Sequence, residues 1–257
     1  MQACLVGPGV PLKTLAFYSL KGGVGKTAAA VNIAYLASQA GIKTLLWDLD
    51  AQGGASWYLG GGDRKTHKLS RLFASDTPIG KLVQETPYPN LELIPAHQSF
   101  RNLDVRLETE GHEDLLKQWL APLSEDTQLV VLDCPPSLSR LAEAVLRAAD
   151  VIAVPVIPTW LSLNSWEQLN SFAKDKKLGH KKLHPFFCMV DRRKQLHREL
   201  ADSELPRLPR QLNTPIPYAS VVEKMGEHQQ PLTAFAGNTP AAKAYQMLWQ
   251  ELFALLD

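Results

Sequence analysis

The run Ser19-Leu20-Lys21-Gly22-Gly23-Val24-Gly25-Lys26-Thr27 decides the fold of this 257-residue chain. Its last three residues complete the phosphate-loop pattern G-x-x-x-x-G-K-[ST]. Closely spaced glycines let the backbone adopt positive φ values and bring its N–H groups near a phosphate. The apolar run at 15–19 predicts a strand before the loop, and 28–39 predicts a helix after it, closed by Gly41. This strand–loop–helix order predicts a nucleotide-phosphate site.

The first half of the loop departs from the ordinary pattern. Leu20 stands where the first glycine is expected, and a second cation, Lys21, follows at once. The pattern predicts that Lys26 reaches the β- and γ-phosphates and that the Thr27 hydroxyl contacts Mg²⁺. The ordinary pattern contains no lysine at the position of Lys21, so we expect Lys21 to have a role that is absent from loops with one lysine.

Length and composition indicate a globular protein. Apolar residues make up 45% of the chain and charged residues 21%, and the formal net charge is +1. This balance argues against a strongly basic nucleic-acid protein, although it is compatible with a local basic face. Cys4, Cys134 and Cys188 lie in or near apolar runs without metal-ligand spacing. The sequence contains no signal segment and no apolar run long enough to span a membrane, so we expect a cytoplasmic protein.

Short apolar runs alternate with helical patterns, which predicts an α/β fold with a doubly wound, mostly parallel sheet flanked by helices. The predicted strands are 15–19, 44–47, 91–94, 129–132, 151–156 and 186–190. The predicted helices are 28–39, 114–120, 138–149, 163–174, 193–200 and 240–256. We expect residues 1–12 to form a loose extension, residues 13–257 to form a single domain, and the proline-rich stretch 204–218 to be a surface connection.

Two of the predicted strands end in carboxylates. Asp48 and Asp50 follow the strand at 44–47, and Asp133 follows the strand at 129–132. Parallel α/β sheets bind ligands at the carboxyl ends of their strands, so these side chains are expected around the phosphate loop. Asp48 and Asp50 are expected to point the same way, where they can hold the Mg²⁺ shell and orient an attacking water. Asp133 is expected to bind Mg²⁺ through water.

Three motifs carry a resemblance to a known family. They are Lys21-Gly22-Gly23-Val24-Gly25-Lys26-Thr27, Asp48-Leu49-Asp50-Ala51-Gln52-Gly53 and Asp133-Cys134-Pro135-Pro136. These runs resemble the deviant Walker A, A′ and B motifs of the ParA/MinD ATPases, and the similarity covers nearly the whole chain after the first dozen residues. Within that family the chain most resembles the short ParA-type partition and positioning ATPases. The resemblance implies the P-loop NTPase fold.

The resemblance also implies an ATP site shared between two subunits. Two chains are expected to form a face-to-face dimer around two ATP molecules, with Lys21 reaching the phosphates of the partner. Asp50 is expected to position the attacking water, and Asp48 to support it. The implied catalytic residues are Lys21, Lys26, Asp48 and Asp50, and the implied metal ligands are Thr27, Asp50 and Asp133. The implied ATP-binding residues are Lys21, Gly22, Gly23, Val24, Gly25, Lys26, Thr27, Ala28, Met189, Asp191, Arg192 and Pro217.

A function follows from the same resemblance. The chain is expected to hydrolyse ATP to ADP and phosphate with Mg²⁺, slowly and under stimulation by an adaptor protein. In its ATP state it is expected to bind DNA non-specifically and to partition or position a plasmid, a chromosome or a large protein assembly over the nucleoid. The candidate DNA-binding residues are Lys176, Lys177, Lys181, Arg192, Arg193, Lys194, Arg198 and Lys224. The arginine that partition ATPases carry shortly after a strand-ending Ile-Pro is absent after Ile216-Pro217.

Three alternatives remain open. A MinD-like, membrane-associated positioning ATPase ends in a basic amphipathic helix, but Lys243 is the only basic residue at 240–256, so no membrane partner is expected. An ATP-dependent metabolic synthetase of the same fold needs no second loop lysine such as Lys21. An iron–sulfur carrier needs cysteines that bridge a dimer, and the sequence offers no suitable pair.

Overall fold

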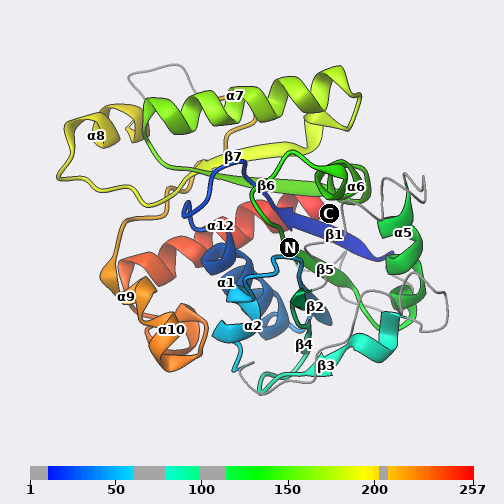
Figure 1. Ribbon diagram of the computed structural model, residues 1–257. Helices are drawn as coiled ribbons and strands as arrows, with labels where there is room; N and C mark the ends of the chain where they lie inside the picture. Colours follow the sequence, from blue (N-terminus) through cyan, green and yellow to red (C-terminus); the bar gives the residue numbers. More distant parts are fainter. Residues whose placement is uncertain (1–10, 61–78, 99–113, 203–207) are drawn as a thin grey trace.

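The computed structural model describes residues 11–60, 79–98, 114–202 and 208–257 (Figure 1). Within these ranges the chain forms a seven-stranded sheet in the order β3-β4-β2-β5-β1-β6-β7. The strands are β1 (Lys13–Phe17), β2 (Thr44–Asp48), β3 (Gln84–Glu85), β4 (Leu91–Ile94), β5 (Leu129–Asp133), β6 (Val151–Val156) and β7 (Leu183–Phe187). All neighbours pair in parallel except β3 with β4. The predicted α/β fold with a mostly parallel sheet is therefore confirmed.

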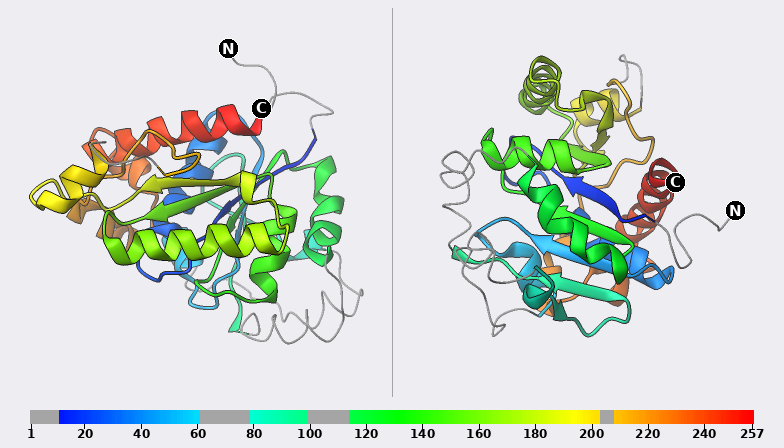
Figure 2. Two further views of the ribbon diagram at one scale, coloured as in Figure 1. Left: turned by 90° about the horizontal axis from the view of Figure 1, so that it is seen from above. Right: turned by 90° about the vertical axis from the view of Figure 1, so that its right-hand side faces the viewer.

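Helices cover both faces of the sheet, with α12 and α7 on opposite sides (Figure 2). One face carries α1 (Lys26–Gln39), α2 (Gly54–Tyr58), α11 (Leu232–Phe235) and α12 (Pro240–Leu256). The other carries α5 (Leu115–Leu120), α6 (Arg140–Ala148) and α7 (Trp160–Asp175). The remaining helices are short: α8 (Gln195–Ala201), α9 (Ser220–Glu223), α10 (Met225–His228), η1 (Ile79–Leu82), η3 (Ala121–Glu125) and η4 (His180–Lys182). The central strands are buried on both faces, which explains why they are continuous apolar runs.

The three sequence motifs lie at the carboxyl edge of the sheet, after β1, β2 and β5. The β1 strand lies between β5 and β6, and the phosphate loop that follows it leads into α1 at this edge. Asp133, the last residue of β5, is the register partner of Phe17 in β1 and of Asp48 in β2. The three motifs, which are far apart in the sequence, therefore meet at one place.

The β7 strand begins three residues earlier than predicted and ends at Phe187. It contains Pro185, and a proline is tolerated there because β7 is an edge strand of the sheet. Beyond β7 the chain pairs with a different segment, since the N–H of Val190 donates to the carbonyl of Ile216 at 3.0 Å. The strand predicted at 186–190 therefore overlaps β7 only at residues 186–187, so its predicted bounds were wrong.

The stretch 204–218 is more than the surface connection that we predicted. Residues 203–207 lie outside the described residues, but Leu212, Thr214 and Ile216 beyond them are buried. The N–H groups of Leu212 and Ile216 donate to carbonyls of Pro185 and Phe187 in β7, both at 2.8 Å. The prolines signalled turns, but they did not reveal that the intervening residues pair with the edge strand.

The N-terminal residues and the helices bear on two further predictions, a loose extension at 1–12 and the absence of a membrane span. Residues 1–10 of the expected loose extension lie outside the described residues, while Leu12 is partly buried against the core. Among the described helices, none combines the length and the apolar character that crossing a membrane requires.

Candidate functional site

A cavity of about 630 Å³ lies at the carboxyl edge of the sheet. It lies among the phosphate loop and the segments that follow β2, β5 and β7, and its volume is typical of a small-molecule site. Its lining residues are Gly22, Gly23, Gly25, Lys26, Thr27, Ala28, Asp50, Gln52, Tyr58, Pro136, Cys188, Met189, Ile216, Pro217, Tyr218, Ala219, Val222, Glu223 and Tyr245. Most of the nucleotide-site residues predicted from the sequence are therefore brought together.

The phosphate loop has the backbone that close approach to a phosphate requires. Gly23 and Gly25 have φ values of +69° and +93°, which residues with a side chain rarely adopt. A Cβ on Gly25 would also lie 2.8 Å from Sγ of Cys188. Since α1 begins directly after Gly25, its free N–H groups and its positive dipole end lie at the cavity. Val24 is buried and does not line the cavity.

Lys26 is buried beside the acidic residues of the site. Its ammonium group donates a hydrogen bond to the carbonyl oxygen of Lys21 at 3.2 Å. Burial lowers the pKa of Lys26, and the nearby charge of Asp133 opposes this effect. A phosphate in the cavity would supply the opposite charge that a buried ammonium group needs.

The surroundings of Asp133 fit a divalent cation. This carboxylate is fully buried, and neither of its oxygens has a hydrogen-bond partner among the described residues. Burial, and then the charge of Asp48, raise the pKa of Asp133 well above its usual range, whereas the neighbouring Thr27 hydroxyl and Lys26 lower it. Orphaned buried carboxylate oxygens next to a hydroxyl are the hard oxygen donors that Mg²⁺ binds directly or through water. Thr27, Asp50 and Asp133 are thus suited to hold a Mg²⁺ ion, which would neutralise phosphate charge.

Asp48 and Asp50, which we expected to point the same way, lie in different surroundings. Asp50 lines the cavity, whereas Asp48, like Asp133, is fully buried and is not among the lining residues. The Oδ2 atom of Asp48 accepts hydrogen bonds from the N–H and the hydroxyl of Ser56, at 2.8 and 2.7 Å. Burial raises the pKa of Asp48 to about 6, although these hydrogen bonds oppose the shift. Strand alternation applies to Asp48 but not to Asp50, because β2 ends at Asp48 and Asp50 belongs to the following turn.

Lys21 does not line the cavity of its own chain. Its ammonium group instead donates a hydrogen bond to Oγ of Ser162, in the first turn of α7, at 3.3 Å. The neighbouring Trp160 and Leu161 are each 64% exposed. The extra lysine therefore lies beside an exposed apolar pair, while the expected lysine, Lys26, lies in the cavity.

The rest of the cavity wall was only partly found from the sequence. Met189 and Pro217 line it as predicted, and Met189 has a φ of +57°, a strained value for a residue with a side chain. Backbone bonds between Val190 and the 216–218 segment hold this part of the wall together. Gln52 lies in a motif that the sequence shows, but no sequence pattern marks the other wall residues, because they come from separate elements that only the tertiary fold brings together. They are Tyr58, Cys188, Tyr218, Ala219, Val222, Glu223 and Tyr245.

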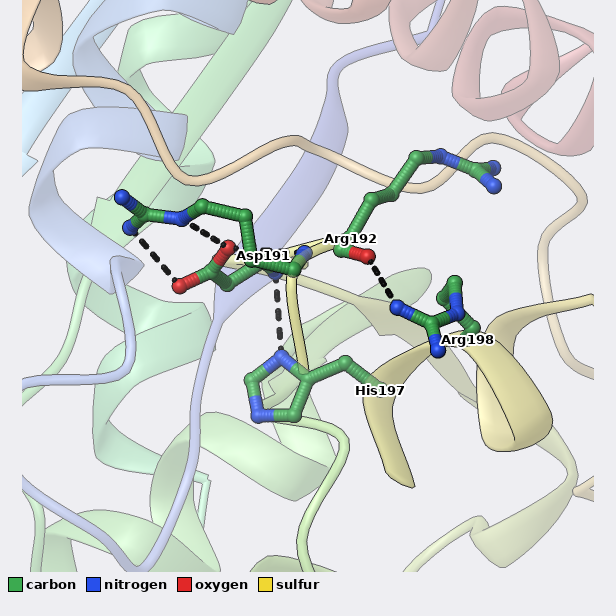
Figure 3. A network of polar contacts seen from close by, with 5 residues as sticks. Asp191, Arg192, His197 and Arg198 are labelled. Atoms are coloured by element: carbon green, nitrogen blue, oxygen red, sulfur yellow. Dashed lines mark hydrogen bonds and ion pairs between the residues drawn. The ribbon is translucent and has the colours of Figure 1, made fainter. Parts of the chain in front are cut away.

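Asp191 and Arg192 do not line this cavity, contrary to the prediction. They belong to a polar network between the end of β7 and α8 (Figure 3). The N–H of Asp191 donates to Nδ1 of the buried His197 at 3.0 Å, and the Asp191 carboxylate accepts two hydrogen bonds from Arg193, at 2.8 and 2.9 Å. These bonds from Arg193 lower the pKa of Asp191 to about 2. Arg198 donates to the carbonyl of Arg192 at 2.7 Å, so the network orders this turn.

The candidate DNA-binding residues fall into separate groups. Helix α7 connects the parallel strands β6 and β7, so it begins at the carboxyl edge of the sheet and ends at the opposite edge, about 24 Å away at 1.5 Å per residue. Lys176, Lys177 and Lys181 follow its end, whereas Arg192, Arg193, Lys194 and Arg198 follow β7 at the nucleotide edge. Lys224 lies between α9 and α10. Some of these charges are paired: Lys176 with Glu143, Arg192 with Asp202, and Arg193 with Asp191.

Comparison with known sequences agrees with this site. The family model described as an AAA domain matches residues 12–183, more than half of the chain. The chain is 32% identical to the chromosome-partitioning ATPase Soj of Treponema pallidum over 248 residues, which cover 94% of this chain and 97% of Soj. It is 34% identical to the chromosome partitioning protein ParA of Myxococcus xanthus, but that match covers 58% of this chain and about half, 53%, of ParA.

Solved structures share the fold over nearly the full length. A plasmid partition protein of Borrelia burgdorferi bound to AMPPNP has a TM-score of 0.80 at 23% identity, covering 95% of this chain and 98% of that one. The cobyrinic acid a,c-diamide synthase of Mycobacterium smegmatis, with ADP and magnesium, has a TM-score of 0.75 at 26% identity, covering 94% of both chains. The motifs, the cavity and the full-length match to Soj lead to one conclusion: this chain belongs to the ParA/MinD family of P-loop ATPases.

Proposed function

We propose that this protein is an ATP-switched positioning ATPase. Two copies close around two molecules of ATP and Mg²⁺, and the ATP-bound dimer binds DNA non-specifically. Slow hydrolysis, stimulated by an adaptor protein, returns it to monomers. The cycle partitions or positions a cargo over the nucleoid, in the cytoplasm. The proposal draws on the likeness to partition proteins and on the site described above.

The proposal depends mainly on the position of the Lys21 side chain, which points away from the cavity of its own chain. Its ammonium group lies on α7 and outside the cavity that holds Lys26 and Thr27. The positive end of the α7 dipole repels a cation at the helix N-terminus, so the hydrogen bond from Lys21 to Ser162 stabilises this position of the ammonium group only weakly. The phosphates of a second copy, docked on the exposed face beside Trp160 and Leu161, offer Lys21 a stronger partner.

A measurement of mass tests this role. With Mg²⁺ and ATP, we expect light scattering to give a dimer for the wild type and a monomer for Lys21→Ala, while the variant still binds nucleotide through Lys26 and Thr27. Lys43→Ala is the matched control, because Lys43 is an exposed lysine at the opposite edge of the sheet. If Lys21→Ala forms the dimer as readily as Lys43→Ala does, the role proposed for Lys21 is wrong.

DNA binding by the dimer would depend on two basic groups of the chain. Both basic groups, around Lys176 and around Arg193, carry cations that neutralise phosphates, and a dimer doubles each group. The ion pairs with Glu143 and Asp191 reduce the charge that is free to do so. Retention on DNA is expected to require ATP and to fall steeply with salt. Retention that is equal with ATP and without nucleotide would count against a switch.

A metabolic synthetase is the second candidate, because the cobyrinic acid a,c-diamide synthase structure matches at 26% identity over 94% of the chain. The Lys21→Ala experiment separates the two functions. A synthetase of this fold has no need for a phosphate cation from a second subunit, so the substitution would leave its assembly unchanged.

A further inference from the structure

The short helix α2 closes a loop beside the phosphate end of the cavity. Residues 48–56 begin at the last residue of β2 and end inside α2. The Asp48 carboxylate joins the two ends, because its Oδ2 atom accepts from the N–H and the hydroxyl of Ser56, at 2.8 and 2.7 Å. Its Oδ1 atom accepts from the N–H of Asp50 at 3.2 Å. One carboxylate therefore holds both α2 and the backbone of Asp50.

Ser56 is also attached to a neighbouring strand. Its Oγ atom accepts a hydrogen bond from the N–H of Ala96, just beyond β4, at 2.9 Å. A serine hydroxyl has one proton to donate, and here that proton goes to Asp48. Ser56 is only 7% exposed and Asp48 is 0% exposed. Loss of this hydroxyl removes one of the two hydrogen bonds that Oδ2 of Asp48 accepts from Ser56, and it takes the acceptor away from the N–H of Ala96.

The effect of Ser56 reaches the cavity through Asp50. Asp50 and Gln52 line the cavity, whereas Ser56 and Asp48 do not. Inside the loop, the Asp50 carboxylate accepts from the N–H of Gln52 at 3.0 Å, and the Asp50 carbonyl accepts from Gly53 at 2.9 Å. Hydrogen bonds within the 48–56 loop therefore link Ser56, Asp48, Asp50 and Gln52. The Ser56 hydroxyl also binds this loop to the residue that follows β4, through the N–H of Ala96.

We propose that Ser56 is a positioning residue for ATP hydrolysis. Through its hydrogen bonds to the Asp48 carboxylate, Ser56 holds the 48–56 loop in place, and this loop presents Asp50 to the terminal phosphate. This inference rests on the proposed ATPase activity. Ser56 lies outside the cavity, and nucleotide binding depends on the phosphate loop, Lys26 and Thr27. Loss of the hydroxyl is therefore expected to slow the chemical step more than it weakens nucleotide binding.

The test compares kcat and KM for Mg·ATP, measured by phosphate release. A displacement of about 1 Å in a positioned group costs on the order of 100-fold in rate, so Ser56→Ala is expected to lower kcat at least about tenfold. KM is expected to stay near the wild-type value, and Ser56→Thr, which keeps the hydroxyl, to restore most of kcat. Ser38→Ala is the matched control, because it removes a buried hydroxyl of α1 that donates to the carbonyl of Tyr35 at 2.8 Å.

The outcomes separate this inference from the proposed function. Equal kcat values for Ser56→Ala and Ser38→Ala would overturn the inference, as would a loss of nucleotide affinity in step with kcat. If thermal unfolding shows that Ser56→Ala is not folded, Ser56→Cys replaces it, because a thiol keeps the shape but is a weak donor. A wild-type protein that does not hydrolyse ATP would instead refute the proposed function.

Discussion

At the scale of single residues, the pairing of Asp48 with Asp133 is costly without a ligand. The two are register partners at the ends of β2 and β5, and both are fully buried. Burial raises the pKa of each carboxyl group, and for Asp133 the charge of Asp48 adds to the effect. A bound divalent cation would neutralise this charge. The pair thus carries a cost in free energy that a bound cation would offset.

Asp48 predicts a pH dependence of stability with an unusual sign. Its folded pKa of about 6 lies above the ordinary value of 3.8, so the folded chain keeps a proton that the unfolded chain releases between about pH 4 and pH 6. The free energy of unfolding therefore falls as pH rises through this range, by up to about 3 kcal/mol at 1.4 kcal/mol per pKa unit. Asp48→Asn is expected to lose the part of this fall that comes from Asp48, as measured by urea unfolding at pH 4 and pH 7 with EDTA and no nucleotide. Parallel curves for variant and wild type would contradict the raised pKa of Asp48.

At the scale of elements, Glu251 of α12 anchors the segment that borders the nucleotide cavity. Its carboxylate accepts from the N–H groups of Asn213 and Thr214, at 2.6 and 2.8 Å, and from both side chains. The same segment continues into Ile216 and Pro217, which line the cavity. An element that packs against β6 therefore also contributes to the wall of the cavity.

Glu251→Ala is expected to weaken nucleotide binding and to cost about 2 kcal/mol of stability, since charge-assisted hydrogen bonds contribute roughly 1.5–3 kcal/mol. Gln250→Ala is the control, because Gln250 is an exposed neighbour on α12. Fluorescent-nucleotide titration and urea unfolding measure the two effects. Equal affinities for both variants would contradict the role of Glu251 in shaping the cavity.

The sequence predicted the elements that build the sheet better than those that complete the site. Continuous apolar runs located β6 to the residue and β2 and β5 to within one residue, because central parallel strands are buried on both faces. The short helices α2, α9 and α10 carry no periodic pattern of useful length, yet Tyr58 and Val222 from two of them line the cavity. Their position depends on tertiary contacts such as the hydrogen bond from Trp57 Nε1 to the carbonyl of Gly226, at 3.0 Å.

At the scale of the whole molecule, the fold separates nucleotide chemistry from part of the basic surface. The cavity, Lys21 and the Arg192–Arg198 region lie at the carboxyl edge of the sheet, and Lys176 and Lys181 lie at the other edge. In a dimer closed at the carboxyl edge, the basic group after α7 would remain on the outside. In the dimer that we propose, this group would be accessible to DNA while both nucleotides would be enclosed.

The most direct test of the central claim, that Lys21 serves the partner's nucleotide, mixes two variants. Lys21→Ala and Lys26→Ala are each expected to hydrolyse little ATP alone. In a mixed dimer, the Lys21→Ala chain keeps Lys26 in its own cavity and receives Lys21 from the other chain, which completes one site. Phosphate release from the mixture is therefore predicted to exceed the sum of the separate variants clearly. A rate equal to that sum would contradict the account, because it would place the action of Lys21 within its own chain.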